Sequence, residues 1–177
     1  GCHFFKVLEE REPVFVLVAK GFGDDAYVMG KVAVCQIQNL LIAYKDRFDR
    51  TGFFQNLLMD NMLLVDIHNR ATKLHIDVDK RRLVYLIETK SDKDNAAEEL
   101  LKSLFVPQTG DFIVSIDEKS IVLIKELEED ASKEDMDEVA DTIVDMLNAE
   151  AMLKVRVAYG QPVNELKDVS KSYKEAK

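Results

Sequence analysis

The stretch that decides the fold is FIVSIDEKSIVLI, residues 112–124. Two runs rich in β-branched residues flank a polar tip that extends from Asp117 to Ser120. Short strand-forming runs separated by a few turn residues are typical of a β-hairpin. Strand and helix patterns alternate on both sides of this stretch, so we expect the hairpin to lie at the centre of a sheet.

The segments around the hairpin alternate between strand and helix patterns. They are a strand at 83–87, a helix at 96–105, the hairpin, a helix at 132–150, a strand at 153–159 and a final helix after Pro162. Ser132 and Asp135 resemble a capping box at the start of one of these helices. From about residue 82 the order is β-α-β-β-α-β-α. This order predicts an α+β, ferredoxin-like fold with helices on one face of a mainly antiparallel sheet.

The first 80 residues carry a strand pair followed by helices. The expected elements are strands at 3–8 and 14–18 and helices at 30–48, 53–65 and 67–75. Thr51 and Gly52 are expected to interrupt the helical pattern. Asp66 is a favourable N-cap for the last of these helices.

The expected 30–48 helix carries a seam of apolar residues that step by three and four positions. The seam consists of Val34, Ile37, Leu41, Tyr44 and Phe48. Two interpretations fit it: the core-facing side of an amphipathic helix, or the contact between two parallel helices of a dimer. The repeat is too short to establish a coiled coil.

Composition limits the possible functions. The 177 residues are 47% hydrophobic and 32% charged, which suits a domain with a packed core and a soluble surface. The formal net charge of −9 disfavours direct contact with the phosphate backbone of DNA. No uninterrupted apolar run approaches the ~18 residues of a membrane span, and residue 1 is not Met. We therefore expect a cytoplasmic piece of a longer protein, with no membrane partner.

No spacing in the chain predicts a metal centre or a nucleophilic site. His68 and His75 are too far apart for a shared i,i+4 metal site, and Cys2, His3 and Cys35 offer no evident fourth ligand. The chain has no Gly-x-Ser-x-Gly turn and no Walker-type phosphate loop. We expect no cofactor and no structural disulfide.

The order of elements resembles that of the GGDEF (diguanylate cyclase) domain, whose signature motif occupies the tip of the central hairpin. The corresponding positions here are Ser115, Ile116, Asp117 and Glu118. The first two replace the glycines of the motif, which let backbone approach a nucleotide closely. The last two stand where its acidic pair stands. Glu88 is a further candidate ligand for Mg²⁺, but Lys90 follows where a second acid would be needed. The resemblance therefore implies a degenerate domain without catalytic residues.

Four stretches make the resemblance more specific, because they indicate one group of proteins with such a domain. They are 53–58, 66–74, 155–163 and the Ser-Tyr-x-x-Ala sequence of Ser172, Tyr173 and Ala176. Together they are similar to the degenerate GGDEF-like region of PucR/CdaR-type bacterial transcriptional regulators, over residues 53–177. Ala158 stands where many members carry a glycine, which puts a tight backbone approach at the following turn in question.

The second resemblance implies a division of the chain and a function. We expect the end of a sensor domain at 1–50, a helical connector at 51–80 and a degenerate GGDEF-like domain at 81–177. In such regulators DNA is bound by a C-terminal helix-turn-helix, which would lie outside this chain. The expected function is non-catalytic: a homodimer that relays the binding of an unknown small-molecule effector. The alternatives are a receptor domain for a nucleotide or other small molecule, and an active diguanylate cyclase.

Overall fold

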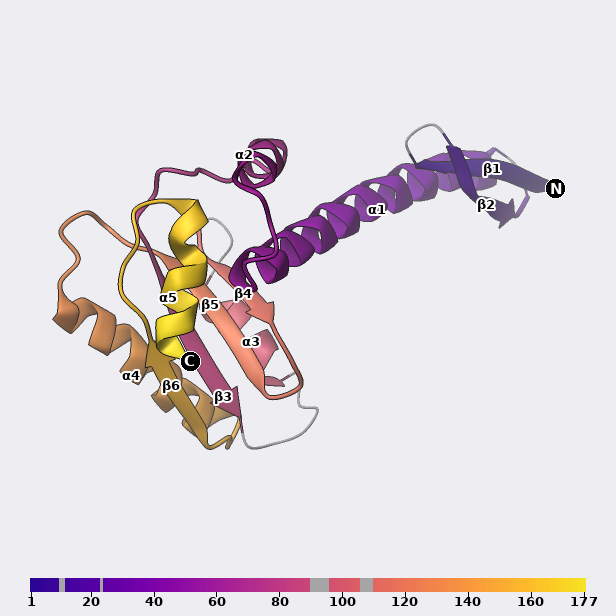
Figure 1. Ribbon diagram of the computed structural model, residues 1–177. Coiled ribbons are helices and arrows are strands. Elements are labelled where there is room, and N and C mark those ends of the chain that lie inside the picture. The colour runs from indigo at the N-terminus through magenta and orange to yellow at the C-terminus, as the bar shows by residue number, and fades with distance from the viewer. Residues whose placement is uncertain (10–11, 23, 90–95, 106–109) are drawn as a thin grey trace. The chain divides into compact units, whose positions relative to one another are not determined.

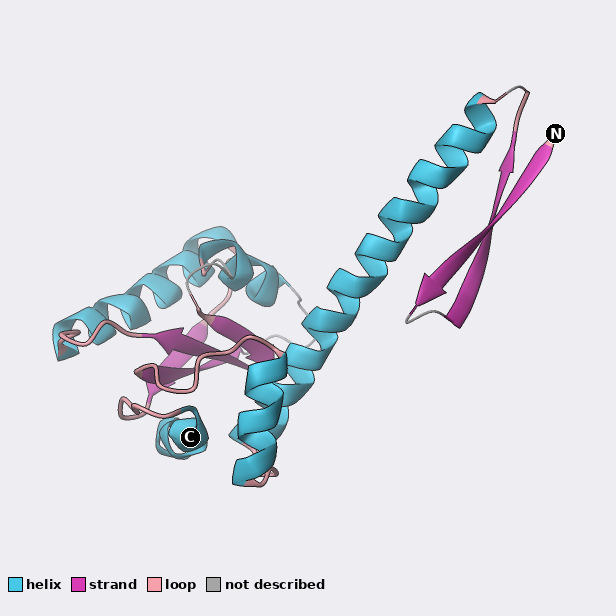
Figure 2. Cartoon of the chain, turned by 90° about the horizontal axis from the view of Figure 1, so that it is seen from above, coloured by secondary structure: helices cyan, strands magenta, loops and turns pink. Residues whose placement is uncertain are grey.

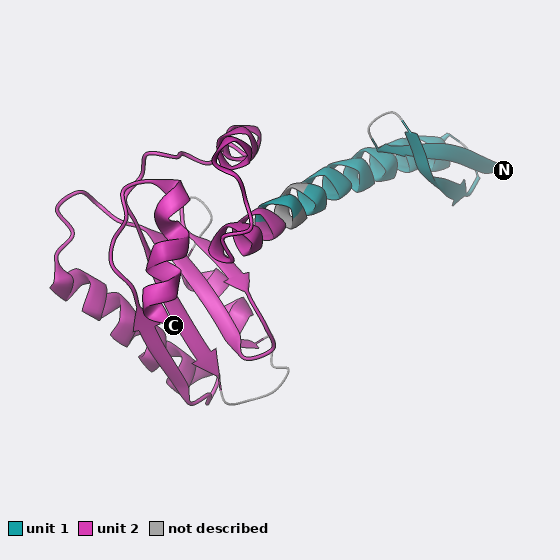
Figure 3. Cartoon of the chain, in the orientation of Figure 1, with its two compact units in different colours: residues 1–50 teal, residues 51–177 magenta. Residues whose placement is uncertain are grey.

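The computed structural model describes residues 1–9, 12–22, 24–89, 96–105 and 110–177, and of residues 46–48 it describes the backbone alone. The chain divides into two compact units, residues 1–50 and residues 51–177 (Figure 3). The long helix α1, Asp25–Leu58, contributes residues to both units.

The first unit consists of a two-stranded antiparallel sheet and the first part of α1. Its strands are β1, Cys2–Glu9, and β2, Glu12–Lys20, which confirm the two predicted strands. Phe5 lies against Gly30 of the helix, where an added Cβ would come within 2.2 Å of the ring. The ring of Phe5 also lies 5.5 Å from that of Tyr27. These contacts place one face of the strand pair on α1.

Helix α1 runs without a break through Thr51 and Gly52, so the predicted interruption is wrong. A glycine inside a helix costs only about 1 kcal/mol relative to alanine. The next turn offsets that cost, because Phe54 is fully buried and the side-chain amide of Asn56 donates to the Gly52 carbonyl at 2.7 Å. Tertiary packing has therefore overridden the local propensity.

The second and third predicted helices also differ from the structure. The predicted 53–65 helix is the last part of α1 and ends at Leu58, and Asp60 then adopts a left-handed φ of 60°. Helix α2, Leu64–Lys73, begins two residues before the predicted N-cap Asp66, which lies in its first turn. A carboxylate in the first turn is favourable because of the helix dipole, so Asp66 supports the helix start without capping it.

The second unit contains a four-stranded sheet of order β4-β5-β3-β6, and every neighbouring pair is antiparallel (Figure 1). Its elements are β3 Arg82–Thr89, α3 Ala96–Leu104, β4 Phe112–Ser115, β5 Ser120–Glu126, α4 Lys133–Glu150, β6 Val155–Tyr159 and α5 Val169–Ala176. The predicted α+β class and the predicted order of elements are confirmed. The predicted central position of the hairpin is half right, because β5 lies inside the sheet and β4 lies at its edge.

Helices cover both faces of this sheet, so the predicted arrangement with helices on one face is wrong (Figure 2). Leu83, Tyr85 and Ile87 of β3 share a core with α3 and α4. Val84 and Leu86 share the opposite core with α2, α5 and the end of α1. The cause is visible in β3, whose first six residues are all buried. A strand that is apolar on both sides needs a cover on both sides.

The predicted 51–80 connector contributes to the core on the α5 side of the sheet. Its buried members are Phe53, Phe54, Leu57, Leu58, Ile67, Ala71 and Ile76. The same cluster includes Val84 of β3 and Val169 of α5. This segment therefore packs as part of the second compact unit.

The predicted final helix after Pro162 begins later, at Val169. Val163 first forms an isolated antiparallel bridge with Arg82, whose amide donates to the Val163 carbonyl at 2.7 Å. A single 3-10 turn, Leu166–Asp168, then leads into α5.

A tight contact between Gly160 and Ser172 fixes α5 on the sheet. A Cβ added to Gly160 would lie 2.0 Å from the Ser172 carbonyl oxygen. Both residues also serve Val84: its N–H donates to Ser172 Oγ and its carbonyl accepts from the Gly160 N–H, each at 3.2 Å. The close approach that Ala158 put in question therefore exists, at Gly160. The Ser-Tyr-x-x-Ala sequence is buried packing, since Tyr173 and Ser172 are both covered.

One helix among the described residues has the length and apolar composition of a membrane span. It is α1, in which an 18-residue window has a mean hydropathy of 1.3 and is 6% buried. A single such helix near an N-terminus is weak evidence for a span. Uninterrupted apolar runs in this helix are short, because Gln36, Gln38 and Asn39 divide them.

Candidate functional site

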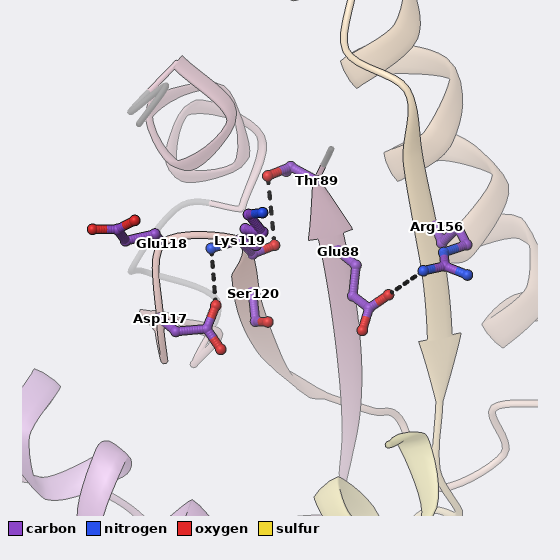
Figure 4. Close-up of a pocket in the computed structure, with 7 residues that line it drawn as sticks. All are labelled: Glu88, Thr89, Asp117, Glu118, Lys119, Ser120 and Arg156. Atoms are coloured by element: carbon purple, nitrogen blue, oxygen red, sulfur yellow. Dashed lines mark hydrogen bonds and ion pairs between the residues drawn. The ribbon is translucent and has the colours of Figure 1, made fainter. Parts of the chain in front are cut away.

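The tip between β4 and β5 is closed by hydrogen bonds among its own residues (Figure 4). The Ile116 N–H donates to the Ser120 carbonyl at 2.9 Å, and the Lys119 N–H donates to the Asp117 carboxylate at 2.8 Å. The hydrogen bond from Lys119 lowers the pKa of Asp117 below its usual value. Asp117 therefore shapes the turn through a local contact to backbone, as aspartates commonly do.

The two residues predicted to replace the glycines of the motif hold structural contacts. Ser115 Oγ donates to Glu98 of α3 at 2.6 Å, and the Ser115 carbonyl accepts from Gln55 Nε2 of α1 at 2.8 Å. Ile116 packs against the core on the α5 side of the sheet. Glu118, in contrast, is exposed and points away from β3 (Figure 4). Ser115 and Ile116 thus contribute to the packing of the domain, whereas Glu118 does not.

Glu88, the candidate metal ligand, forms an ion pair with Arg156. Its Oε2 lies 3.0 Å from Arg156 Nη2, and the two side chains come from the paired strands β3 and β6 (Figure 4). Their side chains are 45% and 79% exposed, so this pair contributes at most about 1 kcal/mol. Lys90 lies outside the described residues. Over the part of the chain that the structure describes, no group of three or more His, Cys, Asp or Glu side chains could hold a metal ion.

An open pocket of about 810 Å³ lies beside the tip. It is lined by Glu88, Thr89, Asp117, Glu118, Lys119, Ser120 and Arg156 (Figure 4). The described lining residues offer charges of both signs and hydrogen-bonding groups, but none of them is an aromatic residue of the kind that most ligand sites use. Sequence reasoning missed Arg156. Only the alternation of the 153–159 strand placed it outward, and its pairing with Glu88 depends on the β3–β6 register.

The predicted dimer seam lies on the side of α1 that carries Gly30. Val34, Ile37 and Leu41 are half-buried there, which fits the core-facing interpretation of the seam. Tyr44 is 71% exposed, and the side chain of Phe48 lies outside what the structure describes.

The other residues weighed as ligands stay apart from the tip. Cys2 and Cys35 are exposed free cysteines. His68 lies in α2, and His75 follows that helix with a left-handed φ of 56°. None of these residues lines the pocket beside the tip.

Comparison with known protein families matches residues 61–177 to the GGDEF-like domain. The chain belongs to the GGDEF-like domain family. The match begins inside the predicted connector, in agreement with the packing of that segment into the domain core. The comparison with curated proteins found no match. A solved structure described as a DGC protein from Thermotoga maritima is 17% identical, with alignment over 69% of this chain and 92% of that one and a TM-score of 0.39.

In this GGDEF-like domain, the carboxylates at the tip do not converge. Asp117 accepts from its own turn, Glu88 faces Arg156, and Glu118 points outward. Metal-assisted phosphoryl transfer needs several oxygen ligands directed at one point, and the nucleotide must bind close to the protein backbone beside them. Among the described residues, these three carboxylates are not directed at one point.

Proposed function

We propose that this chain is a non-catalytic regulatory region of a bacterial transcriptional regulator of the PucR/CdaR type. It would act in the cytoplasm as a homodimer and relay effector binding to a helix-turn-helix domain outside this chain. The proposal rests mainly on one observation: the side chains of Ser115 and Ile116 make packing contacts at the hairpin tip. In the GGDEF motif these two positions are glycines, which let the backbone approach a nucleotide closely.

The same contacts argue against nucleotide turnover. Ser115 bridges α1 and α3, and the side chain of Ile116 packs against the core on the α5 side of the sheet. A nucleotide phosphate that approached residue 115 would meet the Ser115 carbonyl, which already accepts a hydrogen bond from Gln55. Ground-state binding and transition-state stabilisation would both be weakened, because neither has preorganised donors here.

The relay is supported by the course of α1. The helix begins beside the strand pair of the first unit, and its last turns place Phe53, Phe54 and Leu57 in the core of the second. A continuous helix that ends inside a core transmits a displacement or rotation, because a well-packed core does not deform gradually. An effector would act by favouring one of two arrangements of such helices in a dimer.

Two measurements test the proposal on the chain as it stands. Incubation with GTP and Mg²⁺ should give no cyclic dinucleotide, while a competent cyclase in the same buffer gives product. Light scattering over a concentration series should show a dimer. Turnover would overturn the non-catalytic assignment, and a monomer at the highest concentration would overturn the homodimer relay.

A second candidate function is that of a receptor, and the pocket beside the tip favours it. Arg156 and Lys119 supply positive charge there and Glu88 supplies negative charge, a mixture that suits a small polar molecule. A ligand at 100 times its Kd stabilises the folded state by about 2.7 kcal/mol, which thermal unfolding detects readily. We would screen purines, dicarboxylates and cyclic dinucleotides, with Arg156→Ala as the control. No shift with any of them would exclude these three classes.

A further inference from the structure

The first part of α1 is poor in charged residues around its whole circumference. One side faces the strand pair, since Gly30 is buried against Phe5 and Gln38 Nε2 donates to the Leu8 carbonyl at 3.2 Å. Lys31 is the only charged residue between positions 26 and 44. The remaining sides can therefore lose water at little electrostatic cost.

A second stripe runs along the opposite side of the helix. It consists of Val28, Val32, Cys35, Asn39 and Ile42. The steps between its members are four, three, four and three residues, which brings them to one face of a helix. Val28, Val32 and Ile42 are 56%, 52% and 61% exposed. The Asn39 amide lies 4.0 Å from Cys35 Sγ, which shows that the two side chains share this face.

We infer that this outer stripe is where a second copy of the chain docks, as a short parallel two-stranded coiled coil. Steps of four and three are the spacing at which two identical helices keep one seam in contact. In that repeat Val32 and Asn39 occupy a positions, and Val28, Cys35 and Ile42 occupy d positions. A lone asparagine at an a position is the device that fixes a parallel dimer in register, because its amide finds its partner only in the matching asparagine. The inference deepens the proposed homodimer.

The size of the stripe sets the strength of the dimer. Full burial of an aliphatic side chain removes roughly 60–120 Å² from water. Because these side chains are already about half-buried in one copy, each has only about half of that area left to bury in a dimer. With the neighbouring Met29 and Ala43, two copies would bury on the order of 700 Å². Stable interfaces bury about 1,200 Å² or more. The sequence then places aspartates at the next two positions of the repeat, 46 and 49. The outer stripe is therefore short, and the dimer that it forms is weak and reversible, as a relay between two arrangements requires.

Cys35 gives a direct test in the full chain. A disulfide needs Cα atoms within about 7 Å of each other, so two Cys35 residues link efficiently only if the outer stripes face. In a Cys2→Ser background, mild oxidation should produce a covalent dimer that rises with protein concentration. Cys35→Ser should abolish it. Val32→Glu should reduce linking at least tenfold, whereas Val16→Glu, at a similarly exposed valine on the strand pair, should leave it unchanged.

Asn39→Val provides a second readout that folding defects do not mimic. Removing the buried polar pair should tighten association at least tenfold in sedimentation equilibrium and permit species larger than a dimer. A dimer by light scattering that does not link through Cys35 would overturn this surface while leaving the homodimer intact. A monomer at all concentrations would overturn both. Partition of the chain into phosphatidylcholine vesicles without linking would assign the stripe to lipid instead, and would also overturn the inference.

Discussion

Replacing Gly160 with alanine should destabilise the second unit, although alanine restricts the unfolded chain more than glycine does. The added Cβ would meet the Ser172 carbonyl oxygen at 2.0 Å and its carbonyl carbon at 2.7 Å. Both are backbone atoms of helix α5, so a side-chain rotation cannot relieve the overlap. The helix must move away from the sheet, or β6 must bend.

The magnitude follows from two opposing contributions. Overpacking of this kind costs about 1–3 kcal/mol, and a shift of α5 would also lengthen the hydrogen bond between Ser172 and Val84. The lower entropy of the unfolded chain returns about 0.4–1 kcal/mol. The steric cost is the larger of the two, so we expect a net loss of about 1–2 kcal/mol. With a urea m-value of about 1–3 kcal/mol per molar, the unfolding midpoint should fall by roughly 1 M.

The matched control is Gly52→Ala in α1. An added Cβ there meets nothing within 4 Å, and the residue lies inside a helix. Alanine should therefore stabilise the helix by about 0.5–1 kcal/mol. Urea unfolding followed by circular dichroism would compare both variants with the parent chain. The reasoning fails if Gly160→Ala keeps or raises the midpoint, because α5 would then not pack as closely as the structure shows.

Three further predictions use the same unfolding measurement. Ser172→Ala should cost about 1–3 kcal/mol, since it leaves the buried Val84 N–H without its acceptor; an unchanged midpoint would mean that water replaces the hydroxyl. Burial raises the pKa of Tyr85, so its contribution to stability is fully present below the unfolded pKa of about 10 and is lost as the pH rises further. Tyr85→Phe should flatten that loss, and an equally steep fall would assign it to other groups. Glu88→Gln should change stability by no more than about 1 kcal/mol, because its pair with Arg156 is exposed, and a larger loss would contradict this view of the pair.

Local patterns with a single physical cause were predictable from the sequence. The capping box is one example: the Asp135 N–H donates to Ser132 Oγ at 3.2 Å, and the Ser132 N–H donates to the Asp135 carboxylate at 2.8 Å. The hairpin is another, because its two apolar runs pair in register from Phe112 opposite Ile124. In both cases the residues that carry the signal contact each other.

Features that depend on distant residues were not predictable in the same way. Whether α1 breaks at Gly52 depends on the core in which Phe54 is buried. That core includes residues far from Gly52 in the sequence, such as Val84 and Val169. The unbroken apolar run of β3 indicates a strand that is covered on both faces, whereas the order of elements alone predicts helices on one face. The partner of Glu88 depends on the register between strands about seventy residues apart.

Ser115 and Ile116 hold contacts at the hairpin tip that two glycines could not make. Ser115 is the point at which β4, α1 and α3 are joined, through Gln55 on one side and Glu98 on the other. Glycine at 115 would remove the hydroxyl from Glu98, and glycine at 116 would remove packing from the core. The backbone would gain freedom where the fold now relies on fixed contacts. The contact between Ser115 and Gln55 thus connects the hairpin tip to α1.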